Sequence, residues 1–232
     1  MIKEYYAKYL REVRGNSERT VRHYFDALNN ISRRLRKMGL IQEDIYEITD
    51  AESVMKCKEV LFSDPDFIRL NSDGNQMYSA GLNNYIRFIS GADLKTGSIA
   101  LLDMPMVPER QIIGEHETWK RSGLMRNQII VAADYKCEID RNHSSFIAEA
   151  TRKPYMEGHH VIPLSKQPSF PSLSLDVYAN IICLCPVCHR RIHLGLKEDR
   201  GMLMNKIYDE RADRLYNSGI RLSKEEFVRM VE

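Results

Sequence analysis

The segment that most constrains this chain is NIICLCPVCHRRIH, residues 180–193, because it brings cysteines and histidines together in one short run. Cys185 and Cys188 have the Cys-x-x-Cys spacing, which supplies two of the four ligands that a tetrahedral Zn²⁺ needs. His189 and His193 stand at positions i and i+4, so on a helix both imidazoles lie on one face at metal-binding distance. The pattern predicts metal binding, with further ligands from upstream.

Upstream, the segment YKCEIDRNH offers Cys137 and His143, and together with Cys185 and Cys188 these residues form the structural zinc site that we expect. Asp140 is the alternative to His143, because it stands where the second cysteine of a Cys-x-x-Cys pair would be. A carboxylate is a poorer ligand in a sulfur-rich zinc site. The alternative to metal binding is that these are reduced cysteines of a hydrophobic core.

A second site is indicated by two adjacent histidines in YMEGHHVIPL, residues 155–164. Neighbouring side chains on a β-strand point to opposite faces, so His159 and His160 have different roles unless the strand bends. If His159 joins His189 and His193 as a third ligand of a divalent ion, His160 stays unligated and can act as a base. The alternative is a core histidine beside a surface one.

These residues follow one another in a familiar order. They are Glu157-Gly-His159-His160-Val-Ile-Pro-Leu, then Asn180-Ile-Ile, then the Cys-x-x-Cys pair with its two histidines. Over about residues 135–195, this order resembles the ββα-metal motif of the HNH endonucleases. Within that family the chain is most similar to the zinc-bearing, McrA-like restriction endonucleases. Many zinc-bearing relatives have two Cys-x-x-Cys pairs, whereas the first pair here is Cys137 with His143 or Asp140.

The resemblance implies a role for each matching residue. His160 would be the general base, and Asn180 would pin the loop that orients it. Glu157 stands where a carboxylate supports the active site of colicin-type nucleases. The catalytic metal, Mg²⁺, Mn²⁺ or another divalent ion, would be contacted by His159, His189 and His193.

The implied activity is metal-dependent hydrolysis of phosphodiester bonds in duplex DNA by an endonuclease of the restriction or defence type, with cytosine modification as one candidate requirement. A homodimer or sequential nicking would allow both strands to be cut. The alternatives are a zinc-stabilised DNA-binding module without catalysis and an HNH nuclease that acts on RNA or structured DNA. The cationic residues expected to bind phosphates around the site are Arg152, Lys153, Lys166, Arg190 and Arg191.

Composition agrees with an ordinary globular protein, since 43% of the 232 residues are hydrophobic and 28% are charged. The net charge of +2 is too small to indicate nucleic-acid binding by itself, so any cationic surface must be local. No apolar run approaches the about 18 residues that a membrane span needs. Because the first residues are neither a signal peptide nor a lipidation motif, we expect a cytoplasmic protein. Four of the five cysteines fall in the second half, which favours metal binding over a disulfide framework, whereas Cys57 and Cys183 are expected in the core.

We expect an α+β fold: an all-helical domain over residues 1–92, a linker over 93–118, and a ββα-metal nuclease domain with a helical tail over 119–232. Apolar residues at steps of three and four predict an amphipathic helix that begins after Ser17 and stops at Gly39. The far face of that helix is basic and is either a solvated face or a phosphate contact. Its cationic residues are Arg33, Arg34, Arg36 and Lys37.

Overall fold

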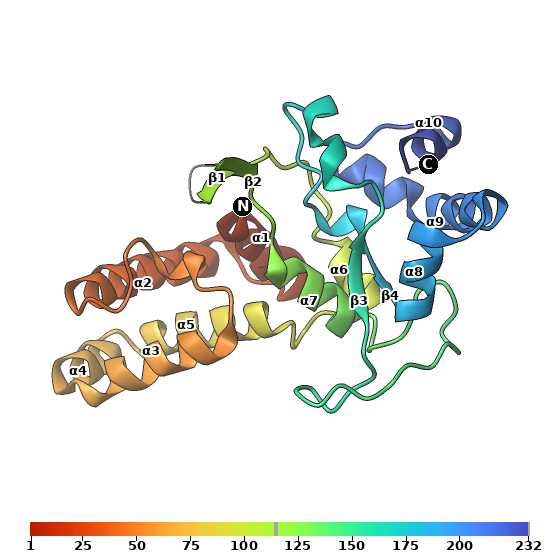
Figure 1. Cartoon of the computed structure of the whole chain (residues 1–232). Coiled ribbons are helices and arrows are strands. Elements are labelled where there is room, and N and C mark those ends of the chain that lie inside the picture. Colours follow the sequence, from red (N-terminus) through yellow and green to blue (C-terminus); the bar gives the residue numbers. More distant parts are fainter. Residues whose placement is uncertain (114–115, 232) are drawn as a thin grey trace. The chain divides into compact units, whose positions relative to one another are not determined.

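The computed structural model describes residues 1–113 and 116–231, and its contacts divide the chain after Asp93 (Figure 1). Residues Ile2–Asp93 form one unit, here the helical unit, and Leu94–Glu232 with Met1 form the other, here the mixed unit. The described residues contain many helices and small two-stranded antiparallel sheets. The expected α+β class is therefore confirmed.

Three helices of the helical unit begin at a side chain that caps them. Ser17 accepts a hydrogen bond from the Thr20 amide at the start of α2, and Asp50 and Asp64 cap α3 and α4 in the same way. The elements are α1 (Ile2–Lys8), a π-helical turn η1 (Tyr9–Val13), α2 (Glu18–Lys37), a 3₁₀ turn η2 (Ile45–Glu47), α3 (Ala51–Ser63), α4 (Pro65–Asp73) and α5 (Met77–Ser90).

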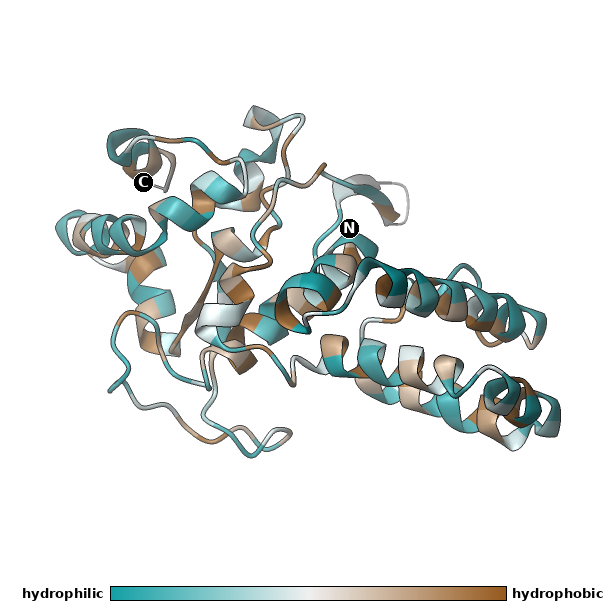
Figure 2. Ribbon diagram, turned by 180° about the vertical axis from the view of Figure 1, so that it is seen from behind, coloured by the Kyte–Doolittle hydropathy of each residue, from teal (hydrophilic) through white to brown (hydrophobic). Residues whose placement is uncertain are grey.

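Apolar faces of these helices pack around a cluster of aromatic rings. The ring of Tyr6 lies 5.3 Å from that of Tyr85 and 5.4 Å from that of Phe88, measured between centroids, and all three side chains are buried. Figure 2 shows the corresponding alternation of hydrophobic and hydrophilic residues along the helices. The outer face of α2 carries the basic cluster, in which Arg34 pairs with Asp64 at 2.9 Å.

The mixed unit begins inside the segment that we expected to be a linker. Residues 93–118 contain α6 (Thr96–Ala100), β1 (Arg110–Ile113) and most of β2 (His116–Trp119), which pairs antiparallel with β1. The elements that follow are α7 (Gly123–Ala132), β3 (Glu157–His160), η3 (Leu164–Ser169), η4 (Tyr178–Asn180), β4 (Ile181–Leu184), α8 (Pro186–Leu194), α9 (Lys197–Asn217) and α10 (Lys224–Val231).

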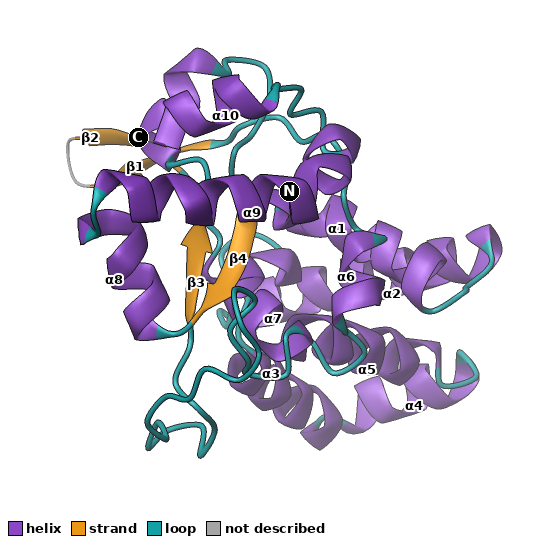
Figure 3. Cartoon of the chain, turned by 90° about the vertical axis from the view of Figure 1, so that its right-hand side faces the viewer, coloured by secondary structure: helices purple, strands orange, loops and turns teal. Residues whose placement is uncertain are grey.

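The sheet of β3 and β4 is the centre of the mixed unit, and both α7 and α8 contact it (Figure 3). Every residue of β4 is buried, as its apolar sequence predicts, and His160 of β3 pairs with Ile181 of β4. Gly158 lets β3 approach α7 closely, because a Cβ there would lie 2.9 Å from the Arg126 Cβ. From α9, the buried Arg211 donates a 3.0 Å hydrogen bond to the Ala179 carbonyl.

Candidate active site and metal centres

A cysteine and histidine cluster lies where α8 begins. One potential ligand atom from each of Cys137, His143, Cys185 and Cys188 lies within 4.8 Å of all the others. Cys185 is the N-cap of α8 and Pro186 is its first residue, so the Cys-x-x-Cys pair forms the first turn of the helix. The Cys185 sulfur accepts a hydrogen bond from the Cys188 amide at 3.4 Å.

His143, rather than Asp140, faces the sulfurs. Its Nδ1 lies 3.3 Å from Sγ of Cys188 and 3.8 Å from Sγ of Cys185. The Asp140 carboxylate lies on the other side of the ring, 3.7 Å from Nε2. A carboxylate behind a ligating imidazole is a common way to orient the ring.

The donor set suits zinc. Burial alone would raise the pKa of the Cys137 thiol, but hydrogen bonds from the backbone of Cys185 and Asp140 and from His143 outweigh it, so the pKa lies below its ordinary value. The thiolate is the form that binds metal. Three sulfurs and one imidazole nitrogen match a closed structural zinc site, so this cluster could hold zinc.

A second cluster consists of histidines alone. Ligand atoms of His159 on β3 and of His189 and His193 on α8 lie within 4.8 Å of one another. Nε2 of His193 is 3.3 Å from Nε2 of His189, because the two residues are one helical turn apart. One short helix, α8, therefore carries ligand atoms of both clusters, which come from Cys185, Cys188, His189 and His193.

The histidine cluster is electrostatically suited to a cation. Burial, with the neighbouring His189 and His193, lowers the pKa of His159 to about 3, so its ring is neutral at physiological pH. A neutral imidazole is the ligating form. Oε2 of Glu157 contacts Nδ1 of His189, which leaves Nε2 of that ring facing His193.

His160 points away from this cluster and meets a carboxylate. Its Nε2 lies 2.7 Å from Oδ1 of Asp176, which is only 2% exposed, and the other carboxylate oxygen accepts a 2.6 Å hydrogen bond from the Ser122 amide. Sequence reasoning missed Asp176. Nothing in the segment SLSLDVYAN distinguishes it, because its role depends on contacts with residues 16 and 54 positions away.

Asn180 joins the two ends of the loop between β3 and β4. Its side-chain oxygen accepts from the Ile162 amide at 2.8 Å, and its amide nitrogen donates to the carbonyls of Ile162 and Leu175 at 2.9 and 2.8 Å. The Asn180 side chain is fully buried. These bonds fix the loop that carries Asp176.

Residues 141–194 match the family model described as HNH endonuclease. The chain carries an HNH domain. The matched segment contains both histidine positions of β3, Asp176, Asn180 and all of α8, whereas Cys137 lies just before it. No curated protein and no solved structure matches the chain. The match supports nuclease activity in general, and HNH nucleases use divalent metals and act on DNA.

The cationic residues expected around the site lie on different parts of the HNH domain. Arg190 and Arg191 are exposed on α8, where Arg191 pairs with Asp199 at 2.7 Å. Lys166 is exposed in η3. Arg152 and Lys153 are exposed in the segment before β3. Among the described residues, no helix combines the length and the apolar character needed to cross a membrane.

Proposed function

We propose that the protein is a metal-dependent DNA endonuclease of the restriction or defence type, which hydrolyses phosphodiester bonds in duplex DNA. One observation carries this proposal: a histidine paired with a buried carboxylate, His160 with Asp176, is the sequence neighbour of a three-histidine cluster on the opposite face of the same strand. A base beside a cation site is what hydrolysis of a phosphodiester requires.

His159, His189 and His193 are the residues that would hold the catalytic ion, Mg²⁺, Mn²⁺ or another divalent metal. Bound there, it would supply Lewis acidity and neutralise charge at the scissile phosphate and the leaving oxygen. Glu157 orients His189 through its contact with Nδ1.

His160 is the proposed general base. As a carboxylate, Asp176 only accepts a hydrogen bond, and in that arrangement the neutral ring carries its proton on Nε2 and its lone pair on Nδ1. Nδ1 can then take the proton from the attacking water. Asn180 supports this geometry through its bonds to Ile162 and Leu175 in the loop that carries Asp176.

The structural zinc site would be formed by Cys137, His143, Cys185 and Cys188. The partner is DNA, whose phosphates would contact Arg152, Lys153, Lys166, Arg190 and Arg191. The restriction or defence role is supported by the resemblance to McrA-like enzymes. Because the described residues of the chain contain one such site, cutting both strands would need a homodimer or two successive nicks.

Plasmid cleavage tests the proposal. Wild-type protein with Mg²⁺, Mn²⁺ or EDTA is compared on unmodified and cytosine-methylated plasmid, next to His160→Ala and to His23→Ala, which removes an exposed histidine of the helical unit. Cleavage should require the metal and should fall by roughly 10² to 10⁴-fold in His160→Ala, with His23→Ala unchanged.

Other outcomes separate the alternatives. Wild-type rates in His160→Ala would remove His160 as the base. Binding of DNA without cleavage would favour a zinc-stabilised DNA-binding module, and cleavage of RNA or of branched DNA in preference to plasmid would change the substrate.

A further inference from the structure

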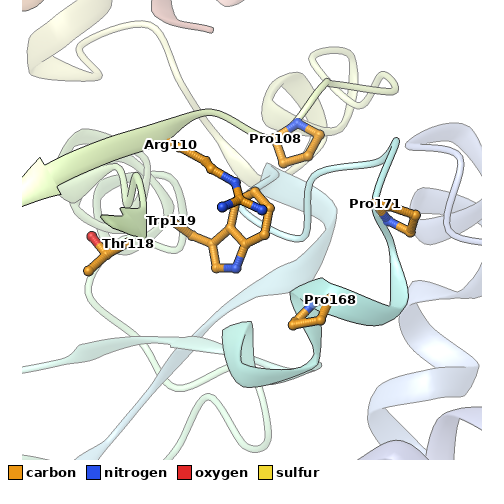
Figure 4. A pocket seen from close by; sticks show the side chains of 6 residues that line it. All are labelled: Pro108, Arg110, Thr118, Trp119, Pro168 and Pro171. Atoms are coloured by element: carbon orange, nitrogen blue, oxygen red, sulfur yellow. The ribbon is translucent and has the colours of Figure 1, made fainter. Parts of the chain in front are cut away.

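A cavity of about 570 Å³ lies beside the β1–β2 hairpin (Figure 4). Its volume is within the range of small-molecule sites. A neighbouring cavity of about 430 Å³ shares Thr118, Trp119 and Pro168 with it. The first cavity is lined by Pro108, Arg110, Thr118, Trp119, Pro168 and Pro171.

The lining suits a flat ring. Trp119, the single tryptophan of the chain, is half-buried, and the guanidinium carbon of Arg110 lies 4.4 Å from the centre of its ring. Arg110 and Trp119 are directly opposite each other in the β1–β2 ladder, which explains their contact. Figure 4 shows Pro168 and Pro171 on a separate segment that faces the indole. Such rigid, apolar walls favour stacking.

The wall opposite Trp119 belongs to a braced loop. Gln167, which is 2% exposed, donates to the carbonyls of Phe170 and Leu173 at 2.8 Å and accepts from the Leu175 amide at 2.8 Å. Pro168, Pro171 and Asp176 all lie in this loop, which joins β3 to β4. A ligand against these prolines would be held in a fixed relation to the loop that contacts His160.

A second connection ties the cavity to His160 from the hairpin side. The Ser122 amide donates to Asp176, whose other oxygen contacts His160. Ser122 follows Trp119 by three residues, so their Cα atoms are at most about 11 Å apart. The hairpin that lines the cavity is therefore linked to the proposed general base through Ser122 and Asp176.

Charge indicates the class of ligand. Among the described residues that line the two cavities, the charged ones are Arg110 and Arg121, and both are exposed cations. Such a surface attracts the phosphates of a polynucleotide, and an indole face stacks on any base.

We propose that this cavity receives a single nucleobase of the substrate, unstacked from its neighbours and stacked on Trp119. The proposal rests on the proposed function, because the base belongs to the strand that the HNH domain would cut. Extruding a base costs least where it is mispaired. A mismatched duplex should therefore bind more tightly than a perfectly paired one.

The test uses Trp119 as its own reporter. The full-length His160→Ala protein, without added divalent ion, is titrated with a dye-labelled duplex that carries one central mismatch and with the matched perfect duplex. Dye anisotropy reports binding, and tryptophan emission reports stacking. We expect tighter binding of the mismatched duplex and quenched emission when it binds.

Variants of the His160→Ala protein test the role of Trp119. Trp119→Ala should weaken binding of the mismatched duplex by roughly 5- to 100-fold and remove the preference for it over the perfect duplex. Trp119→Phe, which keeps an aromatic ring, should retain most of this preference. Tyr216→Ala is the matched control, because this exposed tyrosine also lies under an arginine, with the Arg221 guanidinium 5.0 Å from its ring, and it should bind normally.

The outcomes separate this proposal from the nuclease assignment. A wild-type protein that cleaves plasmid, combined with unchanged Trp119 emission on bound DNA, overturns the base pocket alone. If Trp119 emission is quenched and the mismatched duplex is preferred, but the wild-type protein cleaves no plasmid, the base-pocket proposal is supported and the nuclease proposal is contradicted. If circular dichroism shows that Trp119→Ala does not fold, two other results test the base pocket. These are the quenching of Trp119 emission by the mismatched duplex and the Arg110→Gln variant, which should weaken binding of that duplex.

Discussion

His159 and His160 are adjacent in sequence but have different surroundings, because successive side chains on a strand point to opposite faces. His159 faces two imidazoles of α8, whereas His160 faces a buried carboxylate. One strand residue therefore belongs to a histidine cluster while its neighbour pairs with a carboxylate on the other face.

At the residue scale, Asp176→Asn should lower the cleavage rate at least about tenfold. The amide oxygen would accept from the Ser122 amide, so the NH2 group would face Nε2 of His160 as a donor, and part of the roughly 10² to 10⁴-fold effect of a general base would be lost. Single-turnover cleavage of a labelled duplex measures this. Asp209→Asn in α9, which removes an exposed partner of Lys224, is the control and should cleave normally. An unchanged rate in Asp176→Asn would show that His160 needs no such partner.

Sequence reasoning named the side chains of both cysteine and histidine clusters but missed Asp176, for a physical reason. Ligand pairs such as Cys185 with Cys188, or His189 with His193, have spacings set by one turn of backbone, so they are visible locally. Asp176 is defined only by its tertiary contacts with His160 and with the Ser122 amide.

At the element scale, the contact of β3 with α7 depends on Gly158. Gly158→Ala should lower the free energy of unfolding by roughly 1–3 kcal/mol, because the new Cβ would lie 2.9 Å from the Arg126 Cβ and 3.1 Å from its Cα. It should also lower cleavage, since β3 carries His159. Urea denaturation and plasmid cleavage measure the two effects.

The matched control is Gly201→Ala in α9, where a Cβ would meet no atom within 4 Å. This change should stabilise the protein by about 0.5–1 kcal/mol through helix propensity, with cleavage unchanged. Equal effects of the two substitutions would contradict the close approach of β3 to α7.

The start of α8 should depend on zinc. Cys188→Ser should reduce the zinc content per chain, measured by inductively coupled plasma emission spectroscopy. It should also lower the free energy of unfolding by at least about 3 kcal/mol, because a structural zinc contributes folding energy. Cys183→Ala, in the buried strand β4, is the control and should retain its zinc. Full zinc content with an unchanged melting curve in Cys188→Ser would remove Cys188 as a ligand.

The long elements could be predicted and the short ones could not. α2 has a sustained apolar period and a capping serine, so Ser17 and Gly39 locate its ends. The strands β1 and β2 have four residues each, too few to show a period, and they lie in a segment whose glycines and prolines suggested a linker. Their structure follows from cross-strand pairs such as Arg110 with Trp119.

At the scale of the whole molecule, both clusters draw their ligands from the mixed unit. Removing zinc from the full chain should therefore expose amides of residues 137–143 and of α8 to hydrogen exchange, while those of α5 in the helical unit keep their protection. Exchange measured by mass spectrometry, with and without a chelator, checks this. Equal loss of protection in α5 would mean that the two units unfold together.

Helix α8 carries ligand atoms of both clusters, with Cys185 and Cys188 at its start and His189 and His193 further along it, one turn apart. On the proposed assignment, zinc bound at the first turn would hold in place the helix that carries both histidines, so activity would follow zinc binding. A cell making this protein would then be exposed to cleavage of its own DNA only after metal loading, so zinc supply would act as a maturation checkpoint on a toxic activity.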